Sequence, residues 1–595
     1  MRVSRIVIKN FRALQSVDVA LNGPTTLIIG ENNTGKSCFI QALRLCLDVG
    51  LASSLRMLTK DDVHCEIDQA APFQVFVGVE FTGFEGNENE EALLHGTQIG
   101  EDRARIFYRF RPKRRVREAL AGGEYGDAPI PLDDYGWELF GGGNPAIDLA
   151  EIDWDHENGD IGATSVGLQY LQSYLVVYLP ALRDVETDLQ QTRRSSLARL
   201  IEACNIDKAE QAVLVEAVRA ANTQIEASPT IRAIASAIDG SFKEITGPAF
   251  NLDIELGLSS PSFQAIVRNL IVLLTSPTVR QFEPRRNGLG LNNILYIAIL
   301  IEHFRKRAAV GKSAGELILI EEPEAHLHPQ LQSTLLDALR AMPFQSIATT
   351  HSTQITAKAP LSSFVALTHR PGSSPLAAVP TASTPLTASD AHDLERYLDA
   401  TKSNLLFARR VMLVEGAAEL LLLPALIKKV LRIDLEREGI SVVAIHGIHF
   451  GPFARLFSAT CFPKRCAIVA DADLDPLDVP DGDDAPVKPD LAALEGPFVK
   501  VFLGATTFER ELTVEPNLTM LIKVAEALGA PRIKADLEFQ DLMGGDVPDA
   551  IKDGVLRTSK RFGKARFAQV AARHVADAGA LPAYVMEAVT WLREV

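Results

Sequence analysis

Hydrophobic and polar positions in the first half of the chain predict strands, turns and one helix in close succession. Residues Arg2–Asn10 alternate between the two kinds, as a half-buried strand does. Thr25–Ile29 is a short apolar run that ends at Gly30, and Ser37–Val49 has the spacing of an amphipathic helix. Further strands are expected at Phe73–Phe81, Arg103–Arg111, Glu316–Ile320 and Ser346–Thr350.

Two segments interrupt this pattern, and an α/β pattern restarts after them. Ala181–Ser241 has little Gly or Pro and no strand-like alternation, which predicts a helical insertion. Pro371–Pro385 is rich in Pro, Ser, Thr and Ala, which predicts a linker. Strands and helices then alternate again, so we expect a second, parallel α/β unit. Its strands are expected at Val411–Val414, Ser441–Ile445, Cys466–Ala470 and Val499–Leu503, with a helix at Ala417–Leu431.

Composition narrows the kind of protein. The 595 residues are 47% hydrophobic and 23% charged, which excludes a mostly disordered chain. Asp and Glu number 76 against 60 Lys and Arg, and a net charge of −16 argues against coating nucleic acid by bulk charge. No apolar run approaches the ~20 residues of a membrane span. Six scattered cysteines without a CxxC pair fit a reducing compartment. We therefore expect a cytoplasmic protein that makes no membrane contact.

The segment Gly30–Ser37 carries the first candidate chemistry. It reads GENNTGKS, a full match to GxxxxGK[ST], between a predicted strand and a predicted helix. Glycines let backbone N–H groups approach phosphates, and a helix N-terminus offers them positive potential. Lys36 is expected to reach the β- and γ-phosphates of ATP, and Ser37 to hold Mg²⁺. The predicted nucleotide-binding residues are Gly30, Asn32, Asn33, Thr34, Gly35, Lys36 and Ser37.

Acidic residues and a histidine follow two later strands. An aliphatic strand ends in Glu321 and Glu322. We assign Glu321 to the metal at the ATP site and Glu322 to the general base or to positioning of the attacking water. An acidic surface turn is the alternative. His351 comes just after another strand, where it is expected to sense the γ-phosphate.

The second α/β unit also carries acids at two strand ends. Glu415 follows one strand, and Glu419 lies four residues later on the same side of the next helix. Asp471 and Asp473 follow another strand, where alternation points both into one site. Carboxyl ends of parallel strands form a crevice, so these carboxylates are expected to converge on one or two Mg²⁺ or Mn²⁺ ions. Two such ions can support phosphodiester cleavage. The later acids of this run are interpreted as a surface loop.

A basic stretch is open to two interpretations. Arg103–Arg117 contains eight Arg or Lys residues with aromatic side chains between them. It could follow a DNA backbone, or it could be a solvated hairpin. Four basic residues near the end of the chain are better placed to meet a phosphate backbone, namely Lys560, Arg561, Lys564 and Arg566.

Taken together, these motifs resemble a known family. The stretch IKNFRAL at Ile8–Leu14, the phosphate loop, EEPEAHLHP and THS resemble an ABC-type ATPase head of the SMC-like class. The VEG and DAD motifs resemble a Toprim domain, and the union of the two is the hallmark of the overcoming-lysogenization-defect (OLD) nucleases. The resemblance implies an α/β fold, with an ABC/SMC-like P-loop ATPase that has a helical insertion and a Rossmann-like Toprim domain after it.

The resemblance also implies two more site residues and a plan of domains. Family enzymes carry a later glutamate and a late lysine, assigned here to Glu509 and Lys564, with Glu511 and Lys560 as alternatives. A cation there would stabilise charge that develops on the phosphate. The expected plan is an ATPase in 1–180 and 246–370, a helical insertion used for dimerisation in 181–245, a linker in 371–400 and a Toprim nuclease domain in 401–595.

The function expected from these features is an ATP-binding, metal-dependent DNA endonuclease, regulated by its ATPase, in phage defence or DNA repair. Its cofactors would be ATP, one ion at the ATP site and two Mg²⁺ or Mn²⁺ ions at the Toprim site. Its partners would be DNA, a second copy of the chain and a separately encoded helicase. The catalytic residues would be Glu322, His351, Lys564, Asp471 and Glu415, and the metal ligands Glu415, Glu419, Asp471, Asp473 and Glu509.

Two other functions remain as alternatives. A nucleotide-switched DNA clamp of the SMC-like class would grip DNA without cutting it, but it would not need the complete set of acids. A topoisomerase or primase shares the acid pattern. A topoisomerase would also need a strand-cleaving tyrosine, and the nine tyrosines offer no suggestive context.

Overall fold

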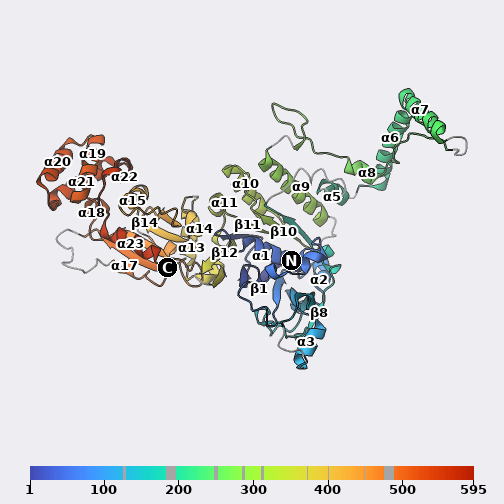
Figure 1. Ribbon diagram of the computed structural model, residues 1–595, viewed down its shortest axis with the longest axis horizontal. Helices are drawn as coiled ribbons and strands as arrows, with labels where there is room; N and C mark the ends of the chain where they lie inside the picture. The colour runs from blue at the N-terminus through green and yellow to red at the C-terminus, as the bar shows by residue number, and fades with distance from the viewer. Residues whose placement is uncertain are drawn as a thin grey trace. The chain divides into compact units, whose positions relative to one another are not determined.

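The computed structural model describes residues 1–124, 129–181, 196–204, 206–246, 252–284, 288–309, 314–370, 373–399, 401–447, 449–474 and 488–594 (Figure 1). Its contacts divide the chain into two units. The larger unit comprises Met1–Ala181, Ala314–Glu324 and Pro329–Val595, and the smaller comprises Leu182–Ser313 and Ala325–His328. Both candidate sites lie in the larger unit.

A six-stranded sheet carries the phosphate loop. Its strand order is β13-β12-β3-β11-β10-β9, and all neighbours are parallel except β12 and β13. One strand, β11, separates β3 from β10, so the loop after β3 and the acids after β10 lie at the same edge of the sheet. The bounds are β3 Thr25–Gly30, β9 Leu175–Leu179, β10 Glu316–Glu321, β11 Gln345–Thr349, β12 Phe364–Arg370 and β13 Ser373–Ala378.

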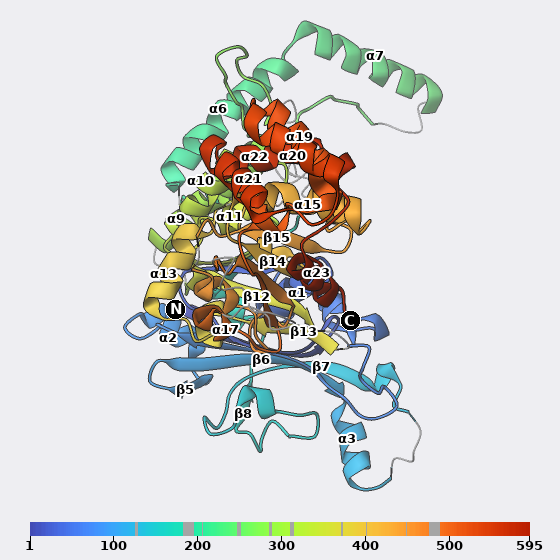
Figure 2. The same ribbon diagram turned by 90° about the vertical axis from the view of Figure 1, so that its left-hand side faces the viewer.

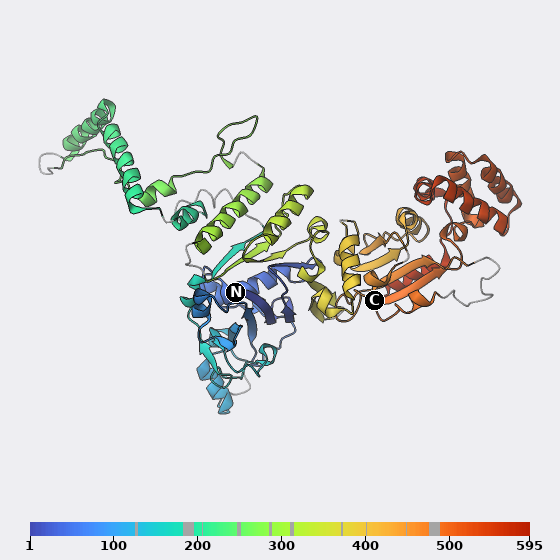
Figure 3. The ribbon, with the colours of Figure 1, turned by 180° about the vertical axis from the view of Figure 1, so that it is seen from behind.

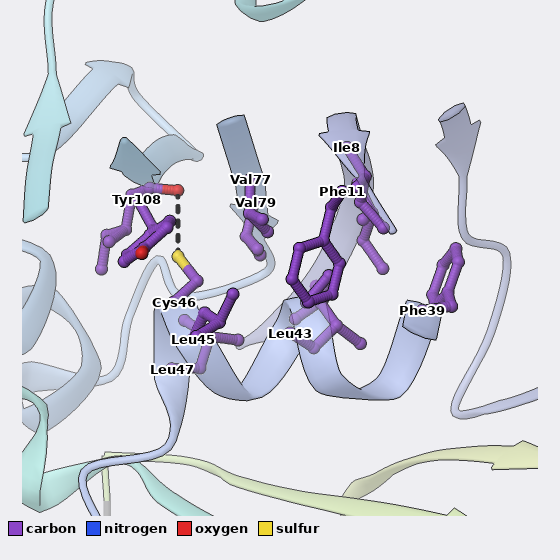
Figure 4. Close-up of a cluster of buried hydrophobic side chains, with 14 of the residues drawn as sticks. Ile8, Phe11, Phe39, Leu43, Leu45, Cys46, Leu47, Val77, Val79 and Tyr108 are labelled. Carbon is purple, nitrogen blue, oxygen red and sulfur yellow. Dashed lines mark hydrogen bonds between the residues drawn. The ribbon is translucent and has the colours of Figure 1, made fainter. Parts of the chain in front are cut away.

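Helix α1 (Lys36–Leu47) packs between this sheet and a seven-stranded antiparallel one. Figure 4 shows the side chains of α1, from Phe39 to Leu47, in a row that faces Ile8, Val77 and Val79 of the second sheet. This buried apolar contact holds the start of α1, and therefore the phosphate loop, in place. The strands of the second sheet are β1 Arg2–Phe11, β2 Leu14–Ala20, β4 Val75–Thr82, β5 Gln98–Gly100, β6 Arg103–Pro112, β7 Tyr135–Gly142 and β8 Ala163–Ser165.

Part of the basic stretch is structural, which contradicts both interpretations for the buried arginines of β6, whereas Arg103 and residues 113–115 are exposed. Arg105, Arg109 and Arg111 are buried, at 1%, 0% and 0% exposure. Their guanidinium groups donate to backbone carbonyls within residues 142–156, a segment that folds over this face of the sheet. Burial lowers the pKa of Arg109 to about 9. These arginines satisfy carbonyl groups that the covering segment would otherwise bury without partners.

The predicted helical insertion consists mainly of helices where the structure describes it, and its residues 182–195 and 205 lie outside the described ranges. Within the smaller unit α5 packs against α9. Figure 3 shows α6 and α7 as two green helices that meet at a turn. The bounds are α5 Ser196–Ala203, α6 Lys208–Glu226, α7 Pro229–Thr246, α8 Phe263–Arg268 and α9 Leu289–Ala309.

The predicted linker 371–400 is a folded part of the structure, which corrects that expectation. Strand β13 pairs with β12, and two helices follow, α12 (Pro380–Ser383) and α13 (Ala388–Tyr397). Ala378 and Val379 are buried, at 2% and 5% exposure. Small residues were interpreted as a linker here, but small size also suits close packing beside another strand.

A four-stranded parallel sheet forms the second α/β region, as the sequence predicts. Its order is β15-β14-β16-β17, so β14 and β16, the strands that precede the acids, are neighbours. Helix α15 packs against β15, and α23 packs against β16 and β17. The bounds are β14 Arg410–Val414, α15 Ala417–Val430, β15 Ile440–Ala444, β16 Cys466–Asp471, β17 Val499–Gly504 and α23 Ala583–Arg593.

Four helices that the sequence pattern did not predict follow β17, and Figure 2 shows them grouped beside α15. They share one apolar core with α15 and the parallel sheet. No helix in the described ranges is long and apolar enough to cross a membrane. The four are α19 Leu518–Ala527, α20 Pro531–Met543, α21 Asp549–Phe562 and α22 Lys564–Arg573. The shorter or peripheral helices are α2 Glu88–Leu94, α3 Arg114–Ala121, α10 Pro329–Arg340, α11 Thr353–Thr356, α14 Asn404–Phe407, α16 Gly451–Ala454, α17 Pro489–Ala492 and α18 Phe508–Glu511.

Candidate functional site

The phosphate loop is a tight turn between β3 and α1 that only glycine allows at two positions. Gly30 has φ +154°, and a Cβ there would lie 2.2 Å from the Leu367 carbonyl oxygen. Gly35 has φ +90° at the helix N-terminus. The Lys36 ammonium curls back over the loop and donates to the carbonyls of Gly30 at 3.0 Å and Glu31 at 2.5 Å. A cation and a helix N-terminus thus meet where a phosphate would bind.

The pKa of Lys36 is set by its burial and by three neighbouring glutamates. Burial lowers the pKa of Lys36 to about 8, while Glu322, Glu31 and Glu324 act to raise that pKa. A bound phosphate would add negative charge beside the ammonium and favour its protonated form further.

The two acids after β10 have different environments. Glu321 Oε2 lies 3.4 Å from the Ser37 hydroxyl, and the Tyr178 hydroxyl donates to Glu321 Oε1 at 3.2 Å. Burial raises the pKa of Glu321, against those two hydrogen bonds. Glu322 has φ +44°, and its N–H donates to the Thr349 carbonyl at 3.1 Å. The structure therefore brings Glu321 to Ser37, the residue expected to hold the metal, and leaves the Glu322 side chain partly exposed.

Glu324, to which the sequence pattern assigned no role, connects the acidic segment to His351. Its Oε1 accepts from the Thr350 hydroxyl at 2.8 Å and from the His351 N–H at 2.7 Å. Its Oε2 is buried without a hydrogen-bond partner among the described residues. Burial lowers the pKa of His351, and Lys36 lowers it further. The third acid of the EEPE motif was the available signal for this contact.

Asp471 is the centre of the second site. Its N–H donates to Glu415 Oε1 at 3.1 Å, and its carboxylate accepts from the Phe508 N–H at 2.9 Å and the Tyr584 hydroxyl at 3.4 Å. Burial raises the pKa of Asp471 to about 8, and the nearby carboxylates of Glu415 and Glu419 add to that rise. Tyr584 comes from α23, and no sequence signal pointed to it.

Glu415 and Glu419 share the environment of Asp471. Glu419 accepts the Gly416 N–H at 3.1 Å and so caps the helix that follows Glu415. Burial raises the pKa of both glutamates, and each is also raised by a neighbouring carboxylate. Three acids of like charge thus lie near one another at the ends of β14 and β16, where the carboxyl ends of the strands were expected to bring them; the expectation that alternation points Asp473 into the same site was wrong.

The glutamate and lysine that the family resemblance implied lie together. Glu509 is 1% exposed, accepts from the Ser559 hydroxyl at 2.9 Å and lies 3.3 Å from the Lys564 ammonium. The alternatives have other contacts, since Glu511 accepts from the backbone and hydroxyl of Thr506, and Lys560 is exposed. Burial lowers the pKa of Lys564, but Glu509 and the other acids outweigh this and raise it overall.

Asp473 lies apart from this buried group. It has φ +56°, its side chain is 60% exposed, and the Lys488 ammonium is 3.5 Å from its Oδ2. The acids at 475–484, interpreted as a surface loop, lie outside the described residues.

The residues present fit a divalent cation by their chemistry. Buried carboxylates that repel one another carry raised pKa values, and a cation would relieve both effects. Oxygen is the donor that hard divalent cations prefer. Among the described residues, however, no three acidic, histidine or cysteine side chains come close enough to hold an ion as they stand. The ligand set therefore stays a prediction, and binding would require the side chains to rotate.

The fold and the two sites define a P-loop ATPase joined to a Toprim domain. The chain belongs to the AAA ATPase domain family, whose model matches residues 1–116 and 150–356, and the model of the overcoming lysogenization defect protein-like TOPRIM domain matches 406–473. These matches confirm the resemblance to the OLD family and the fold class inferred from the motifs. Domains of these two kinds generally use a nucleotide and a divalent metal.

Named relatives cover most of the chain. It is 23% identical over 472 residues to the Old nuclease of Escherichia phage P2, an alignment that covers 75% of this chain and 73% of the relative. It is 21% identical over 471 residues to endonuclease GajA of Bacillus cereus (strain VD045), covering 76% and 72%. Among solved structures, the C-terminal region of the Burkholderia pseudomallei OLD protein is 28% identical, with 31% of this chain and 98% of that one covered and a TM-score of 0.25.

Proposed function

We propose that this chain is an ATP-regulated, metal-dependent DNA endonuclease. The observation that carries the proposal is the group of buried Glu419 and Asp471 with half-buried Glu415, beside the pair of Glu509 and Lys564. Relatives that align with about three-quarters of the chain are named nucleases. A clamp that only grips DNA would have no use for buried acids, which cost free energy to bury without a counter-charge.

We assign the ATPase roles to the phosphate loop and the two strand ends. Gly30, Asn32, Asn33, Thr34 and Gly35 would surround the phosphates through backbone N–H groups. The remaining roles are divided as follows: Lys36 neutralises phosphate charge, Ser37 and Glu321 hold the metal, Glu322 orients the attacking water, and His351 contacts the γ-phosphate.

In the nuclease half, Glu415, Glu419, Asp471 and Glu509 would hold divalent cations, with Asp473 at the rim. We infer two Mg²⁺ or Mn²⁺ ions, which when bound supply charge stabilisation and an activated water. Lys564 would stabilise negative charge on the phosphate being cut, because its ammonium faces the acids from one side. Tyr584 and the Phe508 N–H would orient the Asp471 carboxylate through their hydrogen bonds.

A short connection between the two sites supports regulation by nucleotide. Helix α14 contacts both β3, which leads into the phosphate loop, and β15 of the parallel sheet. The Phe407 ring at its end lies 6.2 Å from the His351 ring, and the Arg409 guanidinium lies 3.4 Å from the Glu31 carboxylate of the loop. Strand β14 starts one residue later and ends beside Glu415. A shift of the loop on nucleotide binding would therefore be transmitted toward the acids.

The remaining parts of the proposal concern partners. DNA would be the substrate, and we infer a homodimer formed through the helical insertion. We also propose a cytoplasmic role in phage defence, and a separately encoded helicase as a further partner.

The central test is cleavage of supercoiled and linear DNA by the purified chain, with Mg²⁺, Mn²⁺, Ca²⁺ or EDTA and with or without ATP. Nicking or linearisation with Mg²⁺ or Mn²⁺, lost in EDTA and altered by ATP, is the expected result. Binding of DNA without cleavage in every metal would favour the clamp in place of the nuclease.

A further inference from the structure

Helices α20 and α21 enclose a groove of about 730 Å³ in the helical region that follows β17. We call it the α20–α21 groove. Phe539, which is 64% exposed, and Phe562 form part of its wall. The rest of the wall that bears on its chemistry consists of Arg532, Arg557, Arg561 and Asp536.

The groove carries a surplus of unpaired positive charge. Arg532, Arg557 and Arg561 are all exposed, and none of them forms an ion pair with any residue in the described ranges. Arg510 of the same region is different, because it is buried and pairs with Asp549 and Asp553. Unpaired guanidinium groups in a hollow are suited to an anionic partner, especially one with phosphate groups.

The segment around the groove has a positive net charge, whereas the whole chain is negative. Residues 554–573 contain six Lys or Arg residues and no Asp or Glu, although the chain carries a net charge of −16. A local basic surface on an acidic protein attracts a polyanion to that place and not to the rest of the molecule.

The groove is built on the helix that also supports the proposed nuclease site. Ser559 of α21 donates to Glu509, while Arg557 and Arg561 of the same helix line the groove. Lys564, which lies 3.3 Å from Glu509, is three residues beyond Arg561. Because Arg557 and Arg561 are each two residues from Ser559 on the same helix, they lie on the opposite face of α21, so a strand bound in the groove would be separated from the acids by the thickness of this helix.

We propose that the α20–α21 groove binds an unpaired stretch of the substrate DNA strand at a distance from the cleavage site, on the far face of the helix that supports it. The three arginines would contact successive phosphates, and Phe539 would stack on a base. Stacking requires an unpaired base, because bases in a duplex stack on one another and present only their edges. This proposal rests on the proposed nuclease function and specifies the form of its substrate.

The test measures binding of the full-length chain, in EDTA, to a fluorescent single-stranded oligonucleotide and to its duplex. Arg532→Gln/Arg557→Gln/Arg561→Gln is expected to weaken single-strand binding about tenfold or more. It should also reduce the magnitude of the negative slope of log K against log salt by about 2, because each phosphate that is no longer neutralised removes ~0.7 from that magnitude. Phe539→Ala is expected to weaken single-strand binding by about 5- to 100-fold and leave duplex binding unchanged. The matched control is Lys428→Gln/Lys429→Gln/Arg432→Gln, three exposed basic residues outside the groove, which should bind as the wild type does.

Two outcomes would overturn the proposal. Wild-type affinity of the triple arginine variant for single strands would mean that the groove does not bind DNA. Loss of duplex and single-strand binding together in the arginine variant, with Phe539→Ala unchanged, would make the groove a duplex backbone surface. Circular dichroism and the thermal unfolding temperature of each variant report on its folding. Plasmid cleavage by the wild-type chain is measured separately, so that failure of the nuclease function is distinguished from failure of the groove.

Discussion

At the scale of single residues, the carboxylates at the strand ends of the parallel sheet carry an electrostatic cost, because burial and like charges disfavour their ionised forms. Asp471 is 4% exposed and faces two other acids, and its pKa rises to about 8 because burial and those neighbours disfavour its charge. A protein can keep such groups only where surrounding packing compensates for the cost. Binding and catalysis are the usual reasons for keeping them, so substitution here should affect activity far more than folding.

We expect Asp471→Ala and Glu415→Ala each to lower DNA nicking on the order of a hundredfold or more, and to leave ATPase activity intact. Losing a metal-binding carboxylate removes several kcal/mol of charge stabilisation, and each ~1.4 kcal/mol is a factor of ten in rate. A plasmid-nicking assay measures the effect. Asp490→Ala is the matched control, because Asp490 is exposed at the start of α17. Full cleavage by both variants would remove the nuclease from this domain.

Glu322→Gln is expected to keep ATP binding and to block ATP turnover. The amide cannot orient or deprotonate a water, whereas Glu321 and Ser37 still meet as in the wild type. Lys36→Ala should instead weaken binding itself, because it removes the cation of the loop. Nucleotide binding by titration calorimetry and phosphate release distinguish the two. If Glu322→Gln fails to bind ATP, the roles of the two glutamates are reversed.

At the scale of elements, short segments determine which parts of the fold contact one another. Helix α14 contains only four residues, yet it contacts both β3 and β15. Strand β6 shows the opposite case, in which three charged residues of one strand are structural because another segment covers them.

A variant with both Phe407→Ala and Arg409→Ala should separate the two activities. It removes the ring beside His351 and the guanidinium beside Glu31 and leaves every proposed catalytic residue unsubstituted. ATP hydrolysis and Mn²⁺-dependent nicking should stay within about threefold of wild type, while the effect of ATP on nicking should disappear. The measurement is the nicking rate against ATP concentration. An unchanged ATP response would show that nucleotide state reaches the nuclease by another route.

At the scale of the whole molecule, the helical insertion contains helices whose apolar side chains are not buried within the single chain. Helices α6 and α7 have no buried residue in the described ranges. Apolar side chains on them stay in solvent, among them Val213 at 68%, Ile225 at 47% and Ile234 at 48% exposure. Exposed apolar surface of this kind is typical of interfaces, and it supports the proposal, first made from the family resemblance, that this insertion forms a dimer.

We therefore expect Val213→Glu/Ile234→Glu to convert a dimer into a monomer while the fold is kept, because both side chains are exposed in the single chain. Sedimentation velocity measures the mass. Lys208→Glu/Arg219→Glu, on the polar positions of α6, is the control for added negative charge and should stay dimeric. A wild-type chain that sediments as a monomer, or a dimer that persists in the apolar variant, contradicts the assignment.

The sequence by itself determined the features that depend on contiguous residues. The phosphate loop, the strands before it and before Glu321, and the acids that end β14 and β16 could all be predicted. Each is a short pattern whose physical cause is local, such as glycine conformation, side-chain alternation or the geometry of a strand end. The pairing of these strands in parallel sheets followed from their alternation with helices.

Only the tertiary structure decided which distant residues meet. It places Glu509, and not Glu511, beside Lys564, and it brings Tyr584 from the end of the chain to Asp471. It also buries Arg109, although a charged strand predicts exposure. Such contacts depend on how segments far apart in the chain pack. A local sequence pattern does not specify which distant segment will pack against it. For the same reason the helices from α19 to α22, and the groove between α20 and α21, appear only once the chain is folded.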